Sequence, residues 1–338
     1  MKNYFIKIIP FYFFVFSQSS IFAQITKQNS NSNASLRAVY ALNENVVWAS
    51  GSNGAVLKTL NGGQTWTKVK SPIDSLDFRD IHVFSENSVI VMSAGEASKG
   101  RAKLFQTIDG GETWILIYES KQPGVFFDSF DFWNAKDGIL LGDPIDGHAF
   151  LLKTDDGGVY WSKVSNFVAP ELKTGEATFA ASGNSLVVKG KQSVWFATQN
   201  RVFFSNDMGR DWSSSPTPLD KSESAGIFGI HFWDEKNGIV VGGDYKQETE
   251  GGKNVAFTKD AGKTWTMDLP TKLYGLKESA FMLPNKTLIA VGASGVSTTS
   301  DLGKVWNNMN YENYHSISCK GKKCWLVGKN GNIAKYEY

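Results

Sequence analysis

The chain has 338 residues with 35 basic and 33 acidic side chains, a formal net charge of +2 at pH 7. Domains that bind nucleic acids are usually strongly basic, so this near-neutral balance argues against that class of partner. The length exceeds what one compact core usually holds, which leaves two domains or an array of repeats.

The N-terminal 23 residues have the pattern of a secretory signal peptide. Lys2 and Lys7 give a basic start, the apolar run IIPFYFFVF occupies 8–16, and small or polar residues lead to Ala23. The apolar run is too short to cross a membrane, so we expect cleavage after Ala23 and export to the periplasm or the medium. We expect residues 24–34 to form a flexible N-terminal segment, because QITKQNSNSN is a poor strand sequence. The alternative is that they supply a closing strand for the last repeat.

An eight-residue motif, Ser/Thr-x-Asp/Asn-x-Gly-x-x-Trp, recurs six times in the rest of the chain. Its copies are TLNGGQTW (59–66), TIDGGETW (107–114), TDDGGVYW (154–161), SNDMGRDW (205–212), TKDAGKTW (258–265) and TSDLGKVW (299–306). The copies are roughly 45 residues apart, which is the period of a propeller blade.

The segments between these motifs follow a constant order of short strands. First-strand candidates are LRAVYAL (36–42), FRDIHVF (78–84), FDSFDFW (127–133), IFGIHFW (227–233) and LKESAFM (276–282). A second strand often ends in Gly, a third runs into the motif, and a fourth begins at its Trp. Four short strands per repeat predict a β-propeller blade, and residues 314–338 supply three strands of a seventh. We therefore expect one all-β domain, 35–338, a seven-bladed propeller with four-stranded antiparallel blades.

The repeated motif is expected to be a structural turn. Its carboxylate or amide can accept backbone N–H bonds, its Gly takes a positive φ, and its Trp buries a large ring. The acceptors are Asn61, Asp109, Asp156, Asp207, Asp260 and Asp301, and the rings are Trp66, Trp114, Trp161, Trp212, Trp265 and Trp306. A calcium or sugar site in these turns is the alternative. All eleven tryptophans occupy repeat-equivalent positions and are expected to pack blade against blade.

The two cysteines, Cys319 and Cys324, lie in SISCKGKKCWLV. Two short strands joined by KGKK would place them nearly opposite each other, and an exported protein meets an oxidising environment. We expect a cross-strand disulfide; a pair of buried free thiols is the alternative.

These motifs resemble the Asp-box (BNR) repeats of sialidase-like propellers. The run of first strand, Gly-rich second strand and T-x-DGG-x-T-W is similar to the plant and cyanobacterial photosystem II stability/assembly-factor family, over roughly 35–338. That resemblance implies a seven-bladed propeller that binds or assembles a protein and has no chemistry of its own.

The long insertions are expected on the face opposite the repeated turns. They are 93–103, 142–150, 165–177, 215–226 and 242–254, and loops gathered above a rigid ring commonly bind ligands. Charged residues near the starts of the first strands could ring the channel mouth and bind an acidic peptide tail or a carboxylated ligand. The candidate partner-binding residues of the mouth and loops are Arg37, Arg79, Asp128, Asp143, His148, Glu176, Asp244, Tyr245, Lys277 and His315. The alternative is internal pairing, for example of Arg79 with Asp128.

A glycoside hydrolase or carbohydrate-binding propeller of sialidase type is the competing functional hypothesis. Candidate carboxylates are Asp128, Asp131, Asp143, Glu176 and Asp244, but the five arginines do not form a recognisable cluster. An oxidoreductase is disfavoured, since no G-x-G-x-x-G lies between a strand and a helix.

The four histidines, His82, His148, His231 and His315, are dispersed. His148, with Asp143 and Asp146 nearby, is the best metal candidate, and we expect neither a metal nor a cofactor. The sequence favours an exported, monomeric, non-enzymatic propeller that binds a protein partner as an assembly or stability factor. It should not span a membrane.

Overall fold

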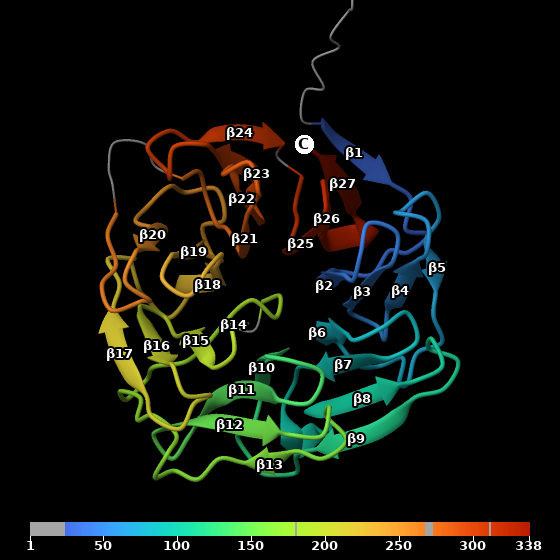
Figure 1. The fold of residues 1–338 in the computed structure, drawn as a ribbon, viewed down its shortest axis with the longest axis horizontal. Helices are drawn as coiled ribbons and strands as arrows, with labels where there is room; N and C mark the ends of the chain where they lie inside the picture. The colour runs from blue at the N-terminus through green and yellow to red at the C-terminus, as the bar shows by residue number, and fades with distance from the viewer. Residues whose placement is uncertain (1–23, 180, 268–272, 311) are drawn as a thin grey trace, which may run out of the picture.

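A computed structural model describes residues 24–179, 181–267, 273–310 and 312–338 (Figure 1). Seven small antiparallel sheets stand around a central axis, so the predicted all-β, seven-bladed propeller is confirmed. Within the described residues the helical elements are two 3-10 turns, η1 (Ala97–Lys99) and η2 (Lys329–Gly331). The predicted signal peptide lies outside the described residues.

The blades follow one another in chain order. Blade one contains β2 (Leu36–Ala41), β3 (Val47–Gly51), β4 (Val56–Thr59) and β5 (Thr67–Lys68). Blade two contains β6 (Phe78–Val83), β7 (Val89–Ser93), β8 (Lys103–Thr107) and β9 (Ile115–Glu119). Blade three contains β10 (Phe127–Phe132), β11 (Gly138–Ile145), β12 (His148–Thr154) and β13 (Ser162–Lys163). Blade four contains β14 (Leu186–Lys189), β15 (Ser193–Ala197), β16 (Arg201–Ser205) and β17 (Ser213–Pro216).

The last three blades complete the ring. Blade five contains β18 (Ala225–Phe232), β19 (Gly238–Asp244) and β20 (Val255–Thr258); among its described residues, a bridge between Phe257 and Thr266 lies where other blades have a fourth strand. Blade six contains β21 (Ser279–Met282), β22 (Leu288–Gly292), β23 (Gly295–Thr299) and β24 (Asn307–Asn310). Blade seven contains β25 (Ser316–Lys320), β26 (Lys323–Val327), β27 (Ile333–Glu337) and β1 (Gln24–Gln28).

Strand β1 closes blade seven and corrects the expectation of a flexible N-terminal segment. It pairs antiparallel with β27 from Gln24 opposite Glu337 to Gln28 opposite Ile333 (Figure 1). Ile25 packs against the cluster between blades six and seven. Backbone pairing with a free strand edge depends little on side-chain type, so even a polar sequence such as QITKQ can form this strand.

The hydrophobic core is divided into seven clusters, one between each pair of neighbouring blades. Trp48, Trp195 and Trp325 of the second strands are at most 2% exposed. All eleven tryptophans lie in or against these clusters, as the repeat positions predict. Tryptophan rings therefore pack between neighbouring blades at six of these seven clusters; the cluster between blades six and seven is formed by other side chains.

The two faces of the ring carry different loops. One face carries the repeated turns, and we call it the box face. There the repeated turn is hydrogen-bonded to the turn between strands one and two of its own blade; for example, Gly62 N donates to Asn45 O at 2.9 Å. The opposite face, which we call the loop face, carries the turns between strands two and three and the connections between blades. These are hydrogen-bonded to each other; for example, Ala94 N donates to Asp77 O at 2.9 Å. The insertions therefore lie on the loop face, as the sequence predicts.

The repeated turn has the same hydrogen bonds in all six copies. In blade two, Thr107 Oγ1 donates to Asp109 Oδ1 at 2.7 Å and accepts from Gly111 N at 2.9 Å, while Asp109 Oδ1 accepts from Thr113 N at 3.0 Å. These bonds, chiefly those from Thr113, hold the pKa of Asp109 below its usual range. The equivalent bonds recur in the other copies.

The two cysteines form the expected disulfide. Cys319 of β25 stands directly opposite Cys324 of β26, and the two are bonded. The disulfide covalently links β25 to β26, the first hairpin of blade seven, which is the blade that β1 closes.

Candidate functional site at the channel mouth

A stretch of blade four crosses the channel mouth on the loop face. We call its described residues, 176–179 and 181–184, the axial segment; they belong to the connection that precedes β14, and this connection reaches toward the axis in Figure 1. Its described residues contact every other blade. The contacted residues are Arg37 (blade one), Asp80 (two), Asp128 and Ser129 (three), Phe228 and Ile230 (five), Glu278 (six) and Ser316 (seven). The protein's own chain therefore occupies the mouth.

Arg37 and Arg79 are the two predicted mouth cations that keep partial exposure. Arg37 Nη1 donates to Ala181 O at 3.4 Å, whereas its Nε is buried without a hydrogen-bond acceptor. Burial, and next the charge of Arg79, lower the pKa of Arg37, while the more distant charges of Glu278 and Asp77 partly oppose this. Arg79 Nε pairs with Asp77 Oδ2 at 2.8 Å. Among the described residues no carboxylate lies within ion-pair distance of Arg37, so its charge is left without a direct counterion.

Lys277 does not belong to an exposed ring, which corrects its predicted role. Its side chain is fully buried, and its Nζ donates to Ser294 Oγ at 2.8 Å and to Gly295 O at 3.1 Å. Burial lowers the pKa of Lys277 to about 7. The strand predicted from residue 276 begins only at Ser279, so Lys277 lies in the inter-blade connection and points into the protein.

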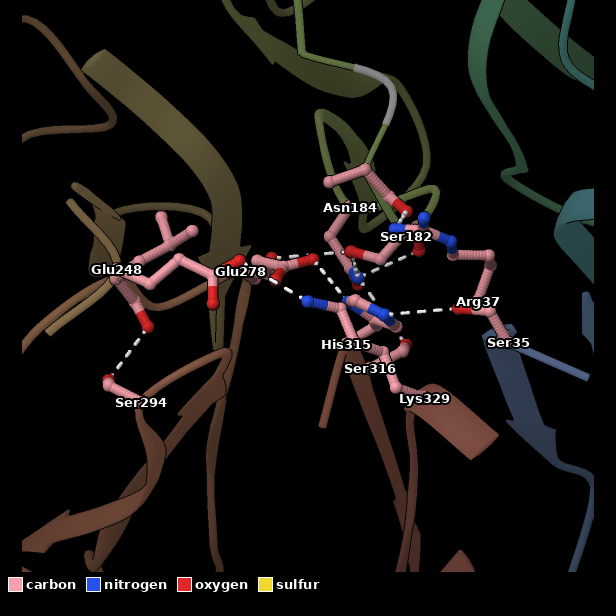
Figure 2. Close-up of polar contacts among 12 residues, drawn as sticks. Ser35, Arg37, Ser182, Asn184, Glu248, Glu278, Ser294, His315, Ser316 and Lys329 are labelled. Atoms are coloured by element: carbon pink, nitrogen blue, oxygen red, sulfur yellow. Dashed lines mark hydrogen bonds and ion pairs between the residues drawn. The ribbon is translucent and has the colours of Figure 1, made fainter. Parts of the chain in front are cut away.

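His315 is also buried rather than presented to solvent. Its Nδ1 lies 2.7 Å from Glu278 Oε2, and its Nε2 lies 3.3 Å from Ser35 Oγ (Figure 2). Both side chains of this hydrogen-bonded pair are less than 5% exposed. The pair therefore joins blades six and seven, and Ser35 extends this junction to blade one.

Asp128 and Asp143 lie together beneath the axial segment. Thr178 Oγ1 donates to Asp128 Oδ2 and lies 3.4 Å from Asp143 Oδ1. Burial raises the pKa of both carboxyl groups, and the neighbouring Asp143 raises that of Asp128 further. Asp128 is 1% exposed, and its Oδ1 has no hydrogen-bond partner. Asp128 is therefore bonded within the protein, as the alternative of internal pairing predicted, but its hydrogen-bond partner is Thr178 rather than Arg79.

Glu176 is engaged by an arginine of its own blade. Its carboxylate accepts from Arg201 Nε at 2.9 Å and also from Thr198 Oγ1. The Arg201 guanidinium in turn lies 4.5 Å from the ring centroid of Phe203. Glu176 therefore anchors the start of the axial segment.

The loop residues predicted for partner binding have separate surroundings. Tyr245 is 45% exposed and meets Phe179 and Phe228 edge-on, while those two rings stack at 4.3 Å. Asp244 Oδ1 accepts from the backbone N of Lys246 at 2.8 Å. Of the two predicted residues Asp244 and Tyr245, Tyr245 is the one with an exposed side chain beside the axial segment.

The described contacts of His148 lie within its own loop and the following connection, away from the mouth. Its Nδ1 bonds Asp146 O at 3.0 Å, and its backbone bridges to Glu171. In the described part of the chain, no group of three or more His, Cys, Asp or Glu side chains is placed to hold a metal ion.

Several residues at the mouth escaped the sequence analysis. Asn184 Nδ2 donates to Ser182 O at 2.8 Å and lies 3.3 Å from Ser316 Oγ, while Ser182 Oγ donates to Glu278 O at 3.4 Å (Figure 2). At the rim, Lys329 Nζ pairs with Glu248 Oε1 at 3.3 Å. The run ATFAASGN has the small, polar composition of an ordinary loop, so no local pattern could reveal that it crosses the axis.

Below the axial segment the channel holds a cavity of about 170 Å³. His82 and His231 from equivalent strands line it, together with Tyr40 and Phe281. The His82 ring lies 4.9 Å from Tyr40, and the His231 ring lies 4.7 Å from Phe281. Burial lowers the pKa of His231 to about 3, so this imidazole is neutral at physiological pH. The two histidines are packing residues of the channel wall.

Within the residues that the structure describes, no helix is both long and apolar enough to span a membrane.

No protein-family model matches the chain. The photosystem II stability/assembly factor HCF136 of rice (Oryza sativa subsp. japonica) is 25% identical over 181 residues, which are 50% of this chain and 39% of that protein. A sialidase of Bacteroides fragilis is 22% identical over 283 residues, 79% of this chain and 47% of that protein. The chain thus spans less than half the length of the curated relatives it matches.

Among solved structures, YCF48 bound to D1 peptide aligns with a TM-score of 0.61 and 14% identity, over 94% of this chain and 97% of that chain. YCF48 from Cyanidioschyzon merolae aligns with 0.63 and 16%, over 93% and 98%. A catalytically inactive virginiamycin B lyase of Staphylococcus aureus aligns with 0.64 and 14%, over 94% and 99%. At these identities the structures show the fold alone. With the sequence match to HCF136, they confirm a weak resemblance to the photosystem II stability/assembly factors.

Proposed function

We propose that the chain is an exported, non-enzymatic propeller that binds a segment of a protein partner at its loop face and acts as an assembly or stability factor. Its weak similarity to photosystem II stability/assembly factors supports this class of function, as does the fold shared with YCF48, whose structure holds a D1 peptide. The Cys319–Cys324 disulfide supports export, because such bonds persist in oxidising compartments.

The observation that carries the proposal is the unpaired charge of Arg37. A half-buried cation without a counterion is costly, and proteins rarely retain one without a use. Arg79 lies close enough to lower the pKa of Arg37, but its own charge is paired with Asp77, so the missing direct counterion is that of Arg37. A carboxylate of the partner would supply the missing counterion and acceptor. The exposed ring of Tyr245 offers an apolar contact on the same face.

The test is recovery of a partner from envelope extract of the native host at low salt. The native chain is compared with Arg37→Gln and with Arg210→Gln, a matched control at an exposed arginine in a box-face turn. Loss of a charge-assisted hydrogen bond costs about 1.5–3 kcal/mol, so Arg37→Gln should weaken binding by roughly tenfold or more. Arg210→Gln should bind as the native chain does. Equal recovery by the native chain and Arg37→Gln, with all three chains folded by circular dichroism, would refute the role of Arg37.

Glycoside hydrolysis is the second candidate, because Asp128 and Asp143 form a close carboxyl pair with raised pKa values and the chain matches a sialidase. Thr178 covers both groups, and Asp128 is almost fully buried, so a substrate would have to displace the axial segment. Turnover of aryl glycosides that disappears in Asp128→Asn would favour this candidate over partner binding.

A further inference from the structure

The outer strand of blade two has an unusual surface. Strand β9 has the sequence ILIYE and lies at the rim of the ring, hydrogen-bonded in the blade to β8 (Figure 1). Ile115 is 59% exposed and Leu116 is 45% exposed. An outermost strand presents unpaired N–H and C=O groups along its free edge, and here that edge is flanked by apolar side chains.

The other outer strands do not share this character. They are β5 (TK), β13 (SK), β17 (SSSP), β24 (NNMN) and β1 (QITKQ). Lysine and proline are common devices that keep strand edges from pairing, and β1, β5, β13 and β17 each carry one. Strand β9 carries neither. The propeller repeat therefore tolerates a polar, protected outer strand, and the apolar edge of β9 is not a requirement of the fold.

The edge of β9 is also electrically neutral. Glu119 is its one charged residue, and Lys103 Nζ of the adjacent β8 lies 2.8 Å from Glu119 Oε1. Two such edges can therefore meet without bringing like charges together. Other exposed apolar side chains lie in the nearby turns: Ile108 of the blade-two turn is 67% exposed, and Tyr160 of blade three is 71% exposed.

We propose that β9 is a self-association edge, at which two copies of this chain pair antiparallel about a twofold axis. A strand that pairs with itself must match itself in reverse, and a centre at Leu116 achieves this within β9: Leu116 meets its own copy, and Ile115 meets Ile117. Glu119 then lies beyond the paired stretch, beside its own Lys103. A centre at Ile117 would instead place Glu119 opposite Ile115.

The contact joins two four-stranded blades into one eight-stranded sheet and uses the same surface on both copies. Ile117 is the extra residue of a bulge between β8 and β9, so the regular stretch is short. The dimer should therefore be reversible and dependent on concentration. The loop face is not part of β9, so the dimer leaves that face free to bind a partner.

The test is sedimentation velocity of the purified chain over a range of micromolar concentrations. The native mass should rise toward twice the monomer mass. Leu116→Lys and Leu116→Glu should each remain monomeric, because like charges would meet at the twofold axis, and a 1:1 mixture of the two should restore dimers. Met309→Lys is the matched control, since Met309 is 39% exposed on the outer strand of blade six, and it should dimerise as the native chain does.

Circular dichroism and the melting temperature establish that each variant is folded. A native chain that stays monomeric up to about 100 µM, a concentration corresponding to a standard free energy of only ~5.5 kcal/mol, would overturn the proposal. A dimer that survives in Leu116→Lys, or a mixture that fails to restore association, would overturn it as well. Binding of an extended peptide to an otherwise monomeric β9 would assign the edge to a different occupant and likewise reject self-association.

Discussion

Gly183 of the axial segment lies directly against the carboxyl group of Asp80. A Cβ on Gly183 would stand 2.4 Å from Asp80 Cγ, and Gly183 has a φ of +67°. The Asp80 carboxyl also accepts from Ile81 N and Phe130 N at 2.8 Å each. A glycine is therefore required here twice, by the backbone conformation and by the close approach of the segment to blade two.

Gly183→Ala should lower the free energy of unfolding by about 2–3 kcal/mol, since it adds steric overlap to an unfavourable φ. Gly175→Ala is the matched control: its φ is +77°, but a Cβ there meets nothing within 4 Å. That variant should cost about 1 kcal/mol, from the backbone conformation alone. Urea unfolding of both variants checks the difference, and equal costs would show that the axial segment is not seated on Asp80.

Lys277→Met should change the dependence of stability on pH. The folded pKa of about 7 lies below the ordinary Lys value, so between pH 7 and 10.5 the unfolded chain binds more protons than the folded chain. Native stability therefore gains up to ~1.4 kcal/mol per pH unit from Lys277 over this range, and loses it as pH falls toward 7. Lys277→Met should remove this slope and stabilise the protein at pH 6. Melting temperatures from pH 6 to 10 test it, with exposed Lys320→Met as control; an unchanged slope in Lys277→Met would contradict the expectation.

Thr107→Val should destabilise the repeated turn of blade two. The hydroxyl of Thr107 is buried and accepts from Gly111 N, so valine leaves a buried N–H without an acceptor at a cost of about 1–3 kcal/mol. Thr107→Ser should be tolerated better, because Ser205 makes the same bond to Gly209 N at 2.8 Å in blade four. Guanidinium unfolding compares the two, and a loss in Thr107→Ser as large as that in Thr107→Val would show that the methyl group, not the hydroxyl, matters.

The repeated turns made the fold predictable. Asp109 and its equivalents each satisfy their hydrogen bonds within a few residues, so the motif specifies local structure wherever it occurs. The disulfide was predictable for the same reason, since Cys319 and Cys324 belong to one hairpin. Local chemistry repeated at a fixed period is what a single sequence can reveal.

The mouth was predictable only in outline. The sequence placed Arg37, Lys277 and His315 at one end of the ring, but their surroundings come from other parts of the chain: Lys277 bonds Ser294 and Gly295, His315 bonds Glu278, and Arg37 bonds the axial segment. The contacts of the axial segment with the other blades join residues far apart in the chain, such as Ser182 with Glu278 or Arg37 with Ala181. No sequence periodicity marks such contacts. The same sequence pattern therefore fits a ring of exposed charged side chains and a ring of buried charged side chains equally well.

Removal of residues 24–28 should destabilise the ring at its closure. The truncation deletes the whole of β1, exposes the edge of β27 and takes away Gln28 Oε1, which accepts from Trp66 Nε1 at 3.0 Å. Loss of this pairing and of the Ile25 contact should lower the free energy of unfolding by at least about 2 kcal/mol, which urea unfolding of the truncated and native chains measures. Lys27→Ala is the control, because its ion pair with Glu312 is largely exposed and should contribute little. A truncated chain that unfolds at the native denaturant midpoint would mean that three strands suffice for blade seven and that β1 adds no closure.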